Sequence, residues 1–171
     1  MVWIDPIFDR TLDDVNLIKE LNDKINTKGW SGLTALQRDK WLMGGAVASI
    51  GVRGALNYVD LNRVEGNCVY LQERLQSYGY MASVNVKLDW TVEDFFRLAD
   101  LNRIKQNVLN LAEVYYTLPT TPTITLLPLT LNYTQLNDIE KFIFDLNVIL
   151  ERMIDSFIYC GTFNCGQEII I

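Results

Sequence analysis

The sequence contains no histidine among its 171 residues, and this absence excludes several classes of enzyme. Ser-His-Asp and Cys-His catalytic sites need an imidazole, and so do most general bases and the mixed Cys/His zinc sites. Cofactor motifs are missing as well: the glycine-rich segment 44–54 lacks the G-x-x-x-x-G-K-[ST] pattern of a phosphate-binding loop. We therefore expect a protein that is not an enzyme and that binds no metal, nucleotide or other cofactor.

Cysteine is scarce, with Cys68, Cys160 and Cys165 as its three occurrences. An odd and low count is unlike the disulfide framework of a small secreted domain. Cys160 and Cys165 resemble half of a metal site or a loop disulfide, but no second pair and no histidine is there to complete a tetrahedral site. We interpret both as free thiols and Cys68 as a small apolar packing residue.

Basic residues are outnumbered, since 15 Lys and Arg stand against 21 Asp and Glu for a net charge of −6. A nucleic-acid partner calls for a basic stripe, so we expect none. The first residues lack the basic and apolar regions of a signal peptide. The uncharged stretch 114–137 is long enough to span a bilayer, but its three prolines exclude a continuous apolar helix. We expect a soluble protein from a reducing compartment, with an extended crossover at 117–131.

An internal repeat is the most informative feature that is present. A ten-residue pattern starts at Leu56, Phe96 and Leu131, with offsets of 40 and 35 residues. Each copy continues with apolar residues at steps of three and four, which share one helix face. These residues are Leu61, Val64, Cys68, Leu71 and Leu75, then Leu101, Ile104, Val108, Leu111 and Tyr115, then Leu136, Ile139, Ile143, Leu146 and Leu150. The repeat predicts three helices, near 58–77, 92–116 and 133–156, with one common core.

The first and third copies carry their own start signals. Asn57 followed by Asp60, and Asn132 followed by Gln135, are variants of the capping box, in which two residues three apart satisfy each other's backbone N–H groups. We therefore expect helices to begin directly after Asn57 and Asn132.

The start of the middle helix is ambiguous. The second copy keeps Asp100 but has Arg97, a poor capping residue, at the cap position. Thr91 and Asp94 offer a second start signal upstream. Either the helix begins near residue 92, or a short turn there precedes it.

Asparagine recurs at one position of the repeat, as Asn62, Asn102 and Asn137. Asparagine is a poor residue inside a helix, so its recurrence asks for a reason. One interpretation is a relic of duplication on a solvated face. The other is a hydrogen bond that each helix makes to a neighbouring segment. The sequence leaves both open.

Four further segments complete the prediction. Thr11 with Asp14 opens an amphipathic helix that ends near Lys28, and Thr34 with Gln37 opens a shorter one. The glycine-rich segment 44–54 is interpreted as a packed loop, and the alternation in 83–90 as a short strand or extended edge. The fold is therefore expected to be mainly α: a bundle of about four to five helices with short extended or β segments over residues 1–156. An extended C-terminal arm, 157–171, follows it.

With the repeat in view, the chain resembles a family of minor structural, tail-associated proteins of phages and prophages of Firmicutes and related gut bacteria. The resemblance covers nearly the whole chain, and its most specific block runs from Gly54-Ala55-Leu56-Asn57 to Arg63-Val64-Glu65. Further matching positions are Trp3, Pro6, Asp9, Arg10, Thr11, Asp14 and Val15, then Leu33, Thr34, Trp41 and Leu42, then Asp89, Trp90 and Thr91, and finally Leu131, Asn132 and Tyr133 with Ile139 and Glu140. The resemblance implies a virion component of the tail, in the adaptor or baseplate region, that is assembled in the cytoplasm of the host bacterium.

This function is expected to work by protein–protein assembly, with the chain as a homo-oligomer, in a ring, that also contacts other virion proteins. Uncharged or apolar arms are typical interface segments, so the expected interface residues lie in the two arms. They are Leu126, Leu127, Phe157, Tyr159, Phe163, Ile169, Ile170 and Ile171. Two alternatives are a bacterial helical-bundle adaptor or regulatory protein that binds a partner protein, and an enzyme that uses carboxylates alone.

Overall fold

The computed structural model describes residues 1–38, 53–127 and 131–160, with side chains as far as Ser156. The helices are α1 (Leu12–Lys28), the short 3-10 helix η1 (Trp30–Gly32), α3 (Tyr58–Ser77), α4 (Leu98–Val114) and α5 (Tyr133–Cys160). A further helical turn begins at residue 35, after the Thr34 cap. No strand occurs in these residues, so the mainly α fold is confirmed.

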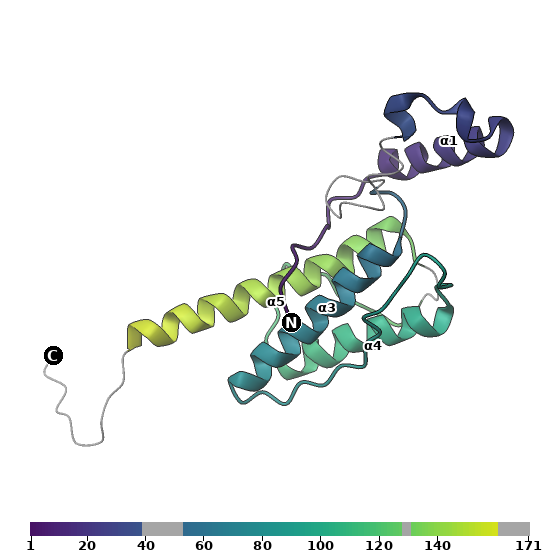
Figure 1. Cartoon of the computed structure of the whole chain (residues 1–171). Coiled ribbons are helices and arrows are strands. Elements are labelled where there is room, and N and C mark those ends of the chain that lie inside the picture. Colours follow the sequence, from purple (N-terminus) through teal and green to yellow (C-terminus); the bar gives the residue numbers. More distant parts are fainter. Residues whose placement is uncertain (39–52, 128–130, 161–171) are drawn as a thin grey trace, which may run out of the picture.

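The three repeat helices α3, α4 and α5 run in the same direction (Figure 1). Ion pairs fix the register of α3 and α5: Arg63 meets Glu140, and Arg74 meets Glu151, eleven residues further along both helices. Because parallel neighbours cannot be joined by tight turns, an extended segment must return along the bundle before each new helix begins. This arrangement sets the geometry of the site described below.

The apolar stripes of the three helices meet in one core, as the repeat predicts. Leu61, Leu101 and Leu136, which are equivalent in the repeat, are 6%, 4% and 6% exposed. The cluster of buried residues draws on all three helices and consists of Leu61, Val64, Cys68, Leu71, Leu75, Ala82, Trp90, Ile104, Val108, Leu111, Ile139, Phe142, Ile143, Leu146 and Leu150. Each fully buried Leu or Ile contributes roughly 1.5–3 kcal/mol.

Capping explains where α3 and α5 begin. Asn57 accepts the N–H of Asp60, and the Asp60 carboxylate accepts the N–H of Asn57, at 3.1 and 3.3 Å. Asn132 and Gln135 make the same pair of bonds at 2.9 and 3.0 Å. Both helix starts lie where the sequence predicts them.

For α4 the structure selects the second of the two predicted starts. Thr91 and Asp94 close a short turn, with Asp94 accepting the N–H of Thr91 at 2.8 Å. The helix itself begins at Leu98, after Arg97, and ends at Val114. Arg97 has no side-chain acceptor, so only the return bond forms, from its N–H to Asp100 at 3.0 Å.

For residues 83–90 the structure selects the extended alternative and not the strand, because their polar groups bond to side chains instead of to another strand. One predicted boundary differs from the structure. The arm does not begin at 157, because α5 continues to Cys160; Phe157 and Tyr159 lie in its last helical turn. Phe163 and Ile169 to Ile171 lie outside the described residues.

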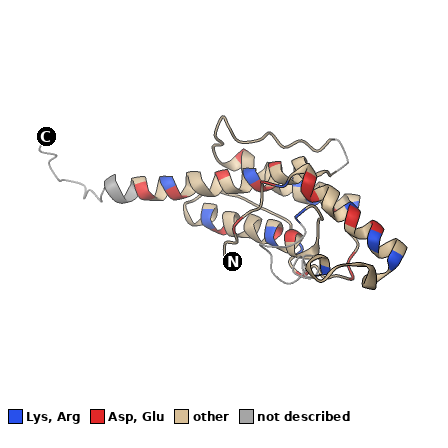
Figure 2. Ribbon diagram, turned by 90° about the horizontal axis from the view of Figure 1, so that it is seen from above, with Lys and Arg blue, Asp and Glu red and all other residues tan. Residues whose placement is uncertain are grey.

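Helix α1 lies beyond the N-terminal ends of the bundle helices and packs against η1 (Figure 1). Thr11 caps α1 through a full capping box with Asp14. Gly54, shortly before α3, packs closely against the backbone of α1. A Cβ at this position would lie 2.3 Å from the backbone oxygen of Asp14, so no larger residue fits without movement. Lys and Arg are interspersed with Asp and Glu along α1 and α5 (Figure 2).

Candidate functional site

Three extended segments lie along the bundle helices, and we call them straps. Strap 1 is residues 3–10, strap 2 is residues 83–90 and strap 3 is residues 121–127. Strap 1 is bonded by side chains of α5 and α3, strap 2 by side chains of α3 and α4, and strap 3 by side chains of α4 and α5. Each strap runs opposite to the helices that hold it. Straps 2 and 3 return the chain between α3 and α4 and between α4 and α5, so that the three helices can be parallel.

The end of straps 1 and 2 is held by the recurrent asparagine. The Asn62 amide donates to the carbonyl oxygen of Trp90 at 2.9 Å and accepts its N–H at 3.0 Å. The Asn137 amide does the same to Arg10, at 2.9 and 3.2 Å. One flat amide thus satisfies both backbone groups of one extended residue, and we call this arrangement a clamp.

A second clamp holds each of these straps from the neighbouring helix. Asn67 of α3 bonds both backbone groups of Ile4, at 2.6 and 3.0 Å. Asn107 of α4 bonds both groups of Asn85, at 2.7 and 2.8 Å. Asn67 and Asn107 are 40 residues apart, which is the offset of the first two repeat copies, and both are buried.

A glutamate three residues after the first clamp adds a further bond to the strap. Glu65 accepts the N–H of Lys87 at 2.8 Å, and Glu140 accepts the N–H of Ile7 at 2.6 Å. In both straps the bonded residue lies three positions before the clamped one. The two grooves therefore hold their straps by the same rule.

The groove between α4 and α5, which holds strap 3, uses the same two repeat positions but has different bonds at each. Asn102 occupies the clamp position, and its buried oxygen has no hydrogen-bond partner among the residues described. Lys105 stands where the other helices have glutamate, and its ammonium donates to the carbonyl oxygen of Leu126 at 3.4 Å. Thr121 adds a bond from its hydroxyl to Asp145 at 3.0 Å. A cation here bonds a strap oxygen where an anion elsewhere bonds a strap N–H.

Ion pairs between helices follow the repeat too. Arg63 of α3 donates to Glu140 of α5 at 2.8 and 3.0 Å, and Arg103 of α4 pairs with Glu65 of α3. The third interface lies between α4 and α5, and there the charges are exchanged. Asp138 of α5 stands at the position of the arginine, and Lys105 of α4 stands at the position of the glutamate. Those two side chains line one cavity of about 190 Å³.

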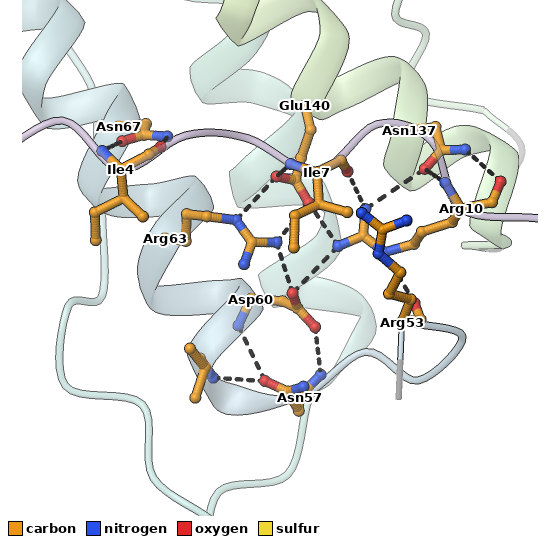
Figure 3. A network of polar contacts seen from close by, with 11 residues as sticks. Ile4, Ile7, Arg10, Arg53, Asn57, Asp60, Arg63, Asn67, Asn137 and Glu140 are labelled. Carbon is orange, nitrogen blue, oxygen red and sulfur yellow. Dashed lines mark hydrogen bonds and ion pairs between the residues drawn. The ribbon is translucent and has the colours of Figure 1, made fainter. Parts of the chain in front are cut away.

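Arg10 of strap 1 completes a buried cluster of four charged side chains (Figure 3). Its guanidinium pairs with Asp60 at 3.2 Å and with Glu140 at 2.7 Å, while Arg63 pairs with Asp60 at 2.6 Å. Burial by itself lowers the pKa of the Arg63 guanidinium, but hydrogen bonds and the charges of Glu140 and Asp60 outweigh it and raise the pKa. Two cations and two anions make the cluster neutral, which buried charges require.

This geometry determines what the cluster does chemically. Asp60 and Glu140 are each bonded to both Arg10 and Arg63, so their charges are neutralised, and they position strap 1 and helix α3. Burial and the nearby Glu65 raise the pKa of the Cys68 thiol to about 12, so it is not a ready nucleophile. Within the described part of the chain no group of three acidic or cysteine side chains is placed to hold a metal ion. No helix among those residues is long and apolar enough to cross a membrane.

Some of the residues that the sequence singles out make contacts in the structure, and others are exposed. Asn62 and Asn137 make the shared hydrogen bond that was one of the two open interpretations. Leu126 and Leu127 are 41% and 68% exposed, and no described segment covers them. Sequence reasoning missed the strap contacts of other residues, which are Arg10, Glu65, Asn67, Asn107 and Glu140. Their positions held a signal, because Glu65 and Glu140 are 75 residues apart, the sum of the two repeat offsets.

Comparison with known proteins finds no matching family model, no similar curated protein and no similar solved structure.

Proposed function

We propose that the chain is a structural component of a phage or prophage tail, in the adaptor or baseplate region, and that it acts by protein–protein assembly. The observation that carries the proposal is the use of its buried polar side chains. In straps 1 and 2, buried amides and carboxylates hold extended backbone, and arginine side chains neutralise the carboxylates. Side chains used in this way position segments of the chain, which supports a structural function. The sequence resemblance to tail-associated proteins implies the same function.

Exposed apolar side chains give the proposal a second support. Met81, Val92, Phe95 and Leu127 are 87%, 79%, 82% and 68% exposed. Single exposed apolar residues are common, but a partner that covers large ones at this exposure lowers the free energy of the system. We propose that the partners are further copies of the chain, in a ring, and neighbouring virion proteins.

Mass spectrometry of purified particles tests this proposal. We expect the chain at a fixed ratio to the other tail proteins after density-gradient purification. A chain found in the cell extract but not in the particles would favour the alternative, a bacterial helical-bundle adaptor or regulatory protein. A genome neighbourhood without tail genes would point the same way.

Light scattering tests the oligomer and the role of the C-terminal arm. The full chain is compared with a chain that ends at Cys160, which keeps all of α5. We expect an oligomer for the full chain and a smaller species for the shortened one, with the same thermal transition for the bundle. Equal masses at equal concentration would remove the arm from the interface.

A further inference from the structure

Two segments at the N-terminal end of the bundle carry opposite charges (Figure 1). The head segment, residues 28–38, contains Lys28 and Arg38 and no acidic residue, so its net charge is +2. The acidic segment, residues 88–98, contains three carboxylates and one arginine, so its net charge is −2. The charges of the two segments are therefore equal in size and opposite in sign.

Most of these charges have no partner within their own chain. Lys28 and Arg38 form no ion pair with any described residue, and neither do Asp89 and Glu93. The third carboxylate, that of Asp94, is paired with a neighbouring lysine of strap 2. Unpaired surface charges steer two molecules together and select their orientation more than they add affinity. Both segments therefore carry charges that can orient a partner of opposite sign.

Both segments also expose large apolar side chains. On the head segment Leu36 is 67% exposed and Trp30 is 41% exposed, and on the acidic segment Val92 and Phe95 are more exposed still. Val92 also lines a cavity of about 300 Å³, which is large enough for an aromatic side chain. Apolar and aromatic side chains make up much of its wall, namely Leu56, Tyr58, Leu61, Trp90 and Phe96. An aromatic anchor in such a cavity, with charges around it, is the usual anatomy of a protein interface.

A second copy of the chain is the partner that fits both segments, because each segment has the charge that the other lacks. Within the described residues no hydrogen bond, ion pair or ring contact joins the two segments of one chain. We infer that, in the assembled form, the head segment of one copy docks on the acidic segment of its neighbour, and that Trp30 and Leu36 cover Val92 and Phe95. The two surfaces differ, so the contact is directional and closes into a ring when the rotation permits. This inference rests on the proposed assembly function and names the surfaces that join the copies.

Mixing two defective variants tests the docking. Leu36→Asp disables the head segment and Phe95→Asp disables the acidic segment, and both side chains are exposed, so the thermal transition of the bundle should persist. By light scattering we expect each variant alone to dissociate at a concentration on the order of tenfold higher than the unchanged chain. In an equal mixture, one chain keeps its head segment and the other keeps its acidic segment. The mixture should therefore form a 1:1 dimer, at high concentration, that neither variant forms alone.

A charge exchange provides a second set of variants. Lys28→Glu and Glu93→Lys each place like charges across the contact and should weaken assembly. Both substitutions in one chain restore opposite charges, so part of the assembly should return. Tyr116→Asp, at a position that is 65% exposed and outside both segments, is the matched control and should leave the mass unchanged.

The outcomes separate the docking from the assembly function. An oligomer that persists in both Leu36→Asp and Phe95→Asp, or an equal mixture that gives no dimer, would overturn the docking and leave the assembly function standing. An unchanged chain that is monomeric would overturn both the docking and the homo-oligomer, while particle composition still decides the virion assignment.

Discussion

Asn62 and Asn137 each bond the N–H and the carbonyl oxygen of one extended residue. Asparagine suits this task because its amide carries a donor and an acceptor side by side. Without the amide, both backbone groups would be left without a partner in a partly buried site. The clamps therefore stabilise the fold mainly because they keep the N–H and the carbonyl oxygen of the strap residue hydrogen-bonded.

Replacing Asn62 by Ala tests the clamp. We expect a loss of about 1–3 kcal/mol in the free energy of unfolding, because Trp90 loses both bonds at once. Urea unfolding followed by circular dichroism measures it. Asn22→Ala, on the exposed face of α1, is the control and should change stability by less than about 0.5 kcal/mol. Equal effects of the two substitutions would contradict the clamp.

Two glycines form a second matched pair. At Gly54 a Cβ would meet backbone atoms of Asp14 and Val15, whereas at Gly66, within α3, it would meet no atom within 4 Å. We expect Gly54→Ala to destabilise the protein. Gly66→Ala should stabilise it by roughly 0.5–1 kcal/mol, since alanine is the better helix former. Thermal melting of both variants checks the opposite signs, and a shift of the same sign would refute the close approach at Gly54.

The exchanged charges of the third interface give the order of the helices a physical basis. In the observed order Arg63 faces Glu140 and Arg103 faces Glu65, and both pairs are opposite in sign. In the mirror-image order Arg63 would face Lys105 and Asp138 would face Glu65, so two of three contacts would repel. Helices that come from one repeat are otherwise interchangeable. The reversal therefore favours one arrangement over its mirror image.

A double-mutant cycle tests this pairing. Lys105→Glu alone places a second carboxylate beside that of Asp138 in the same cavity and should destabilise the protein. Adding Asp138→Arg recreates the arrangement of the other two interfaces and should recover stability. We expect a coupling energy on the order of 1 kcal/mol or more, measured by urea unfolding of the four proteins. Strictly additive effects would show that the two side chains do not interact.

At the scale of single helices the sequence predicts most boundaries, because caps and apolar spacing are local signals. The caps at Asn57 and Asn132 and the regular apolar steps place α3 and α5 correctly at their starts. The start of α4 could not be decided, since Thr91 and Arg97 both follow patterns that begin helical turns. Alternating apolar residues in 83–90 predicted a short strand or an extended edge, because the same alternation suits any extended segment with one buried side. What differs is the partner of its backbone, and a single sequence does not reveal that.

In the whole molecule, Arg10 links strap 1 to α3 and α5 by buried ion pairs. Removing it leaves Asp60 and Glu140 with one cation between them. We expect Arg10→Ala to lower the free energy of unfolding by about 3–5 kcal/mol, as for other broken buried pairs. Arg152→Ala, at an exposed position of α5, is the matched control, and we expect a change within about 0.5 kcal/mol. Guanidinium unfolding of both variants decides, and a small effect at Arg10 would contradict the cluster.

The parallel course of the helices lies beyond what the sequence predicts. The repeat indicates three equivalent helices with one core, but it carries no information on direction. Contacts such as that between Arg10 and Glu140, 130 positions apart, leave no pattern in a single sequence. The candidate site could be predicted only in part: the recurrence of Asn62 and Asn137 showed that the position mattered, and the structure supplied the straps they hold.

The pairing of Arg10 with Glu140 has a consequence for translation. A ribosome adds about 5–20 residues per second, so strap 1 leaves it roughly 10 s before Glu140 is made. Through that interval the groove lacks the wall that α5 provides, and Arg10 stays in water. The segment made first is thus the segment that docks last.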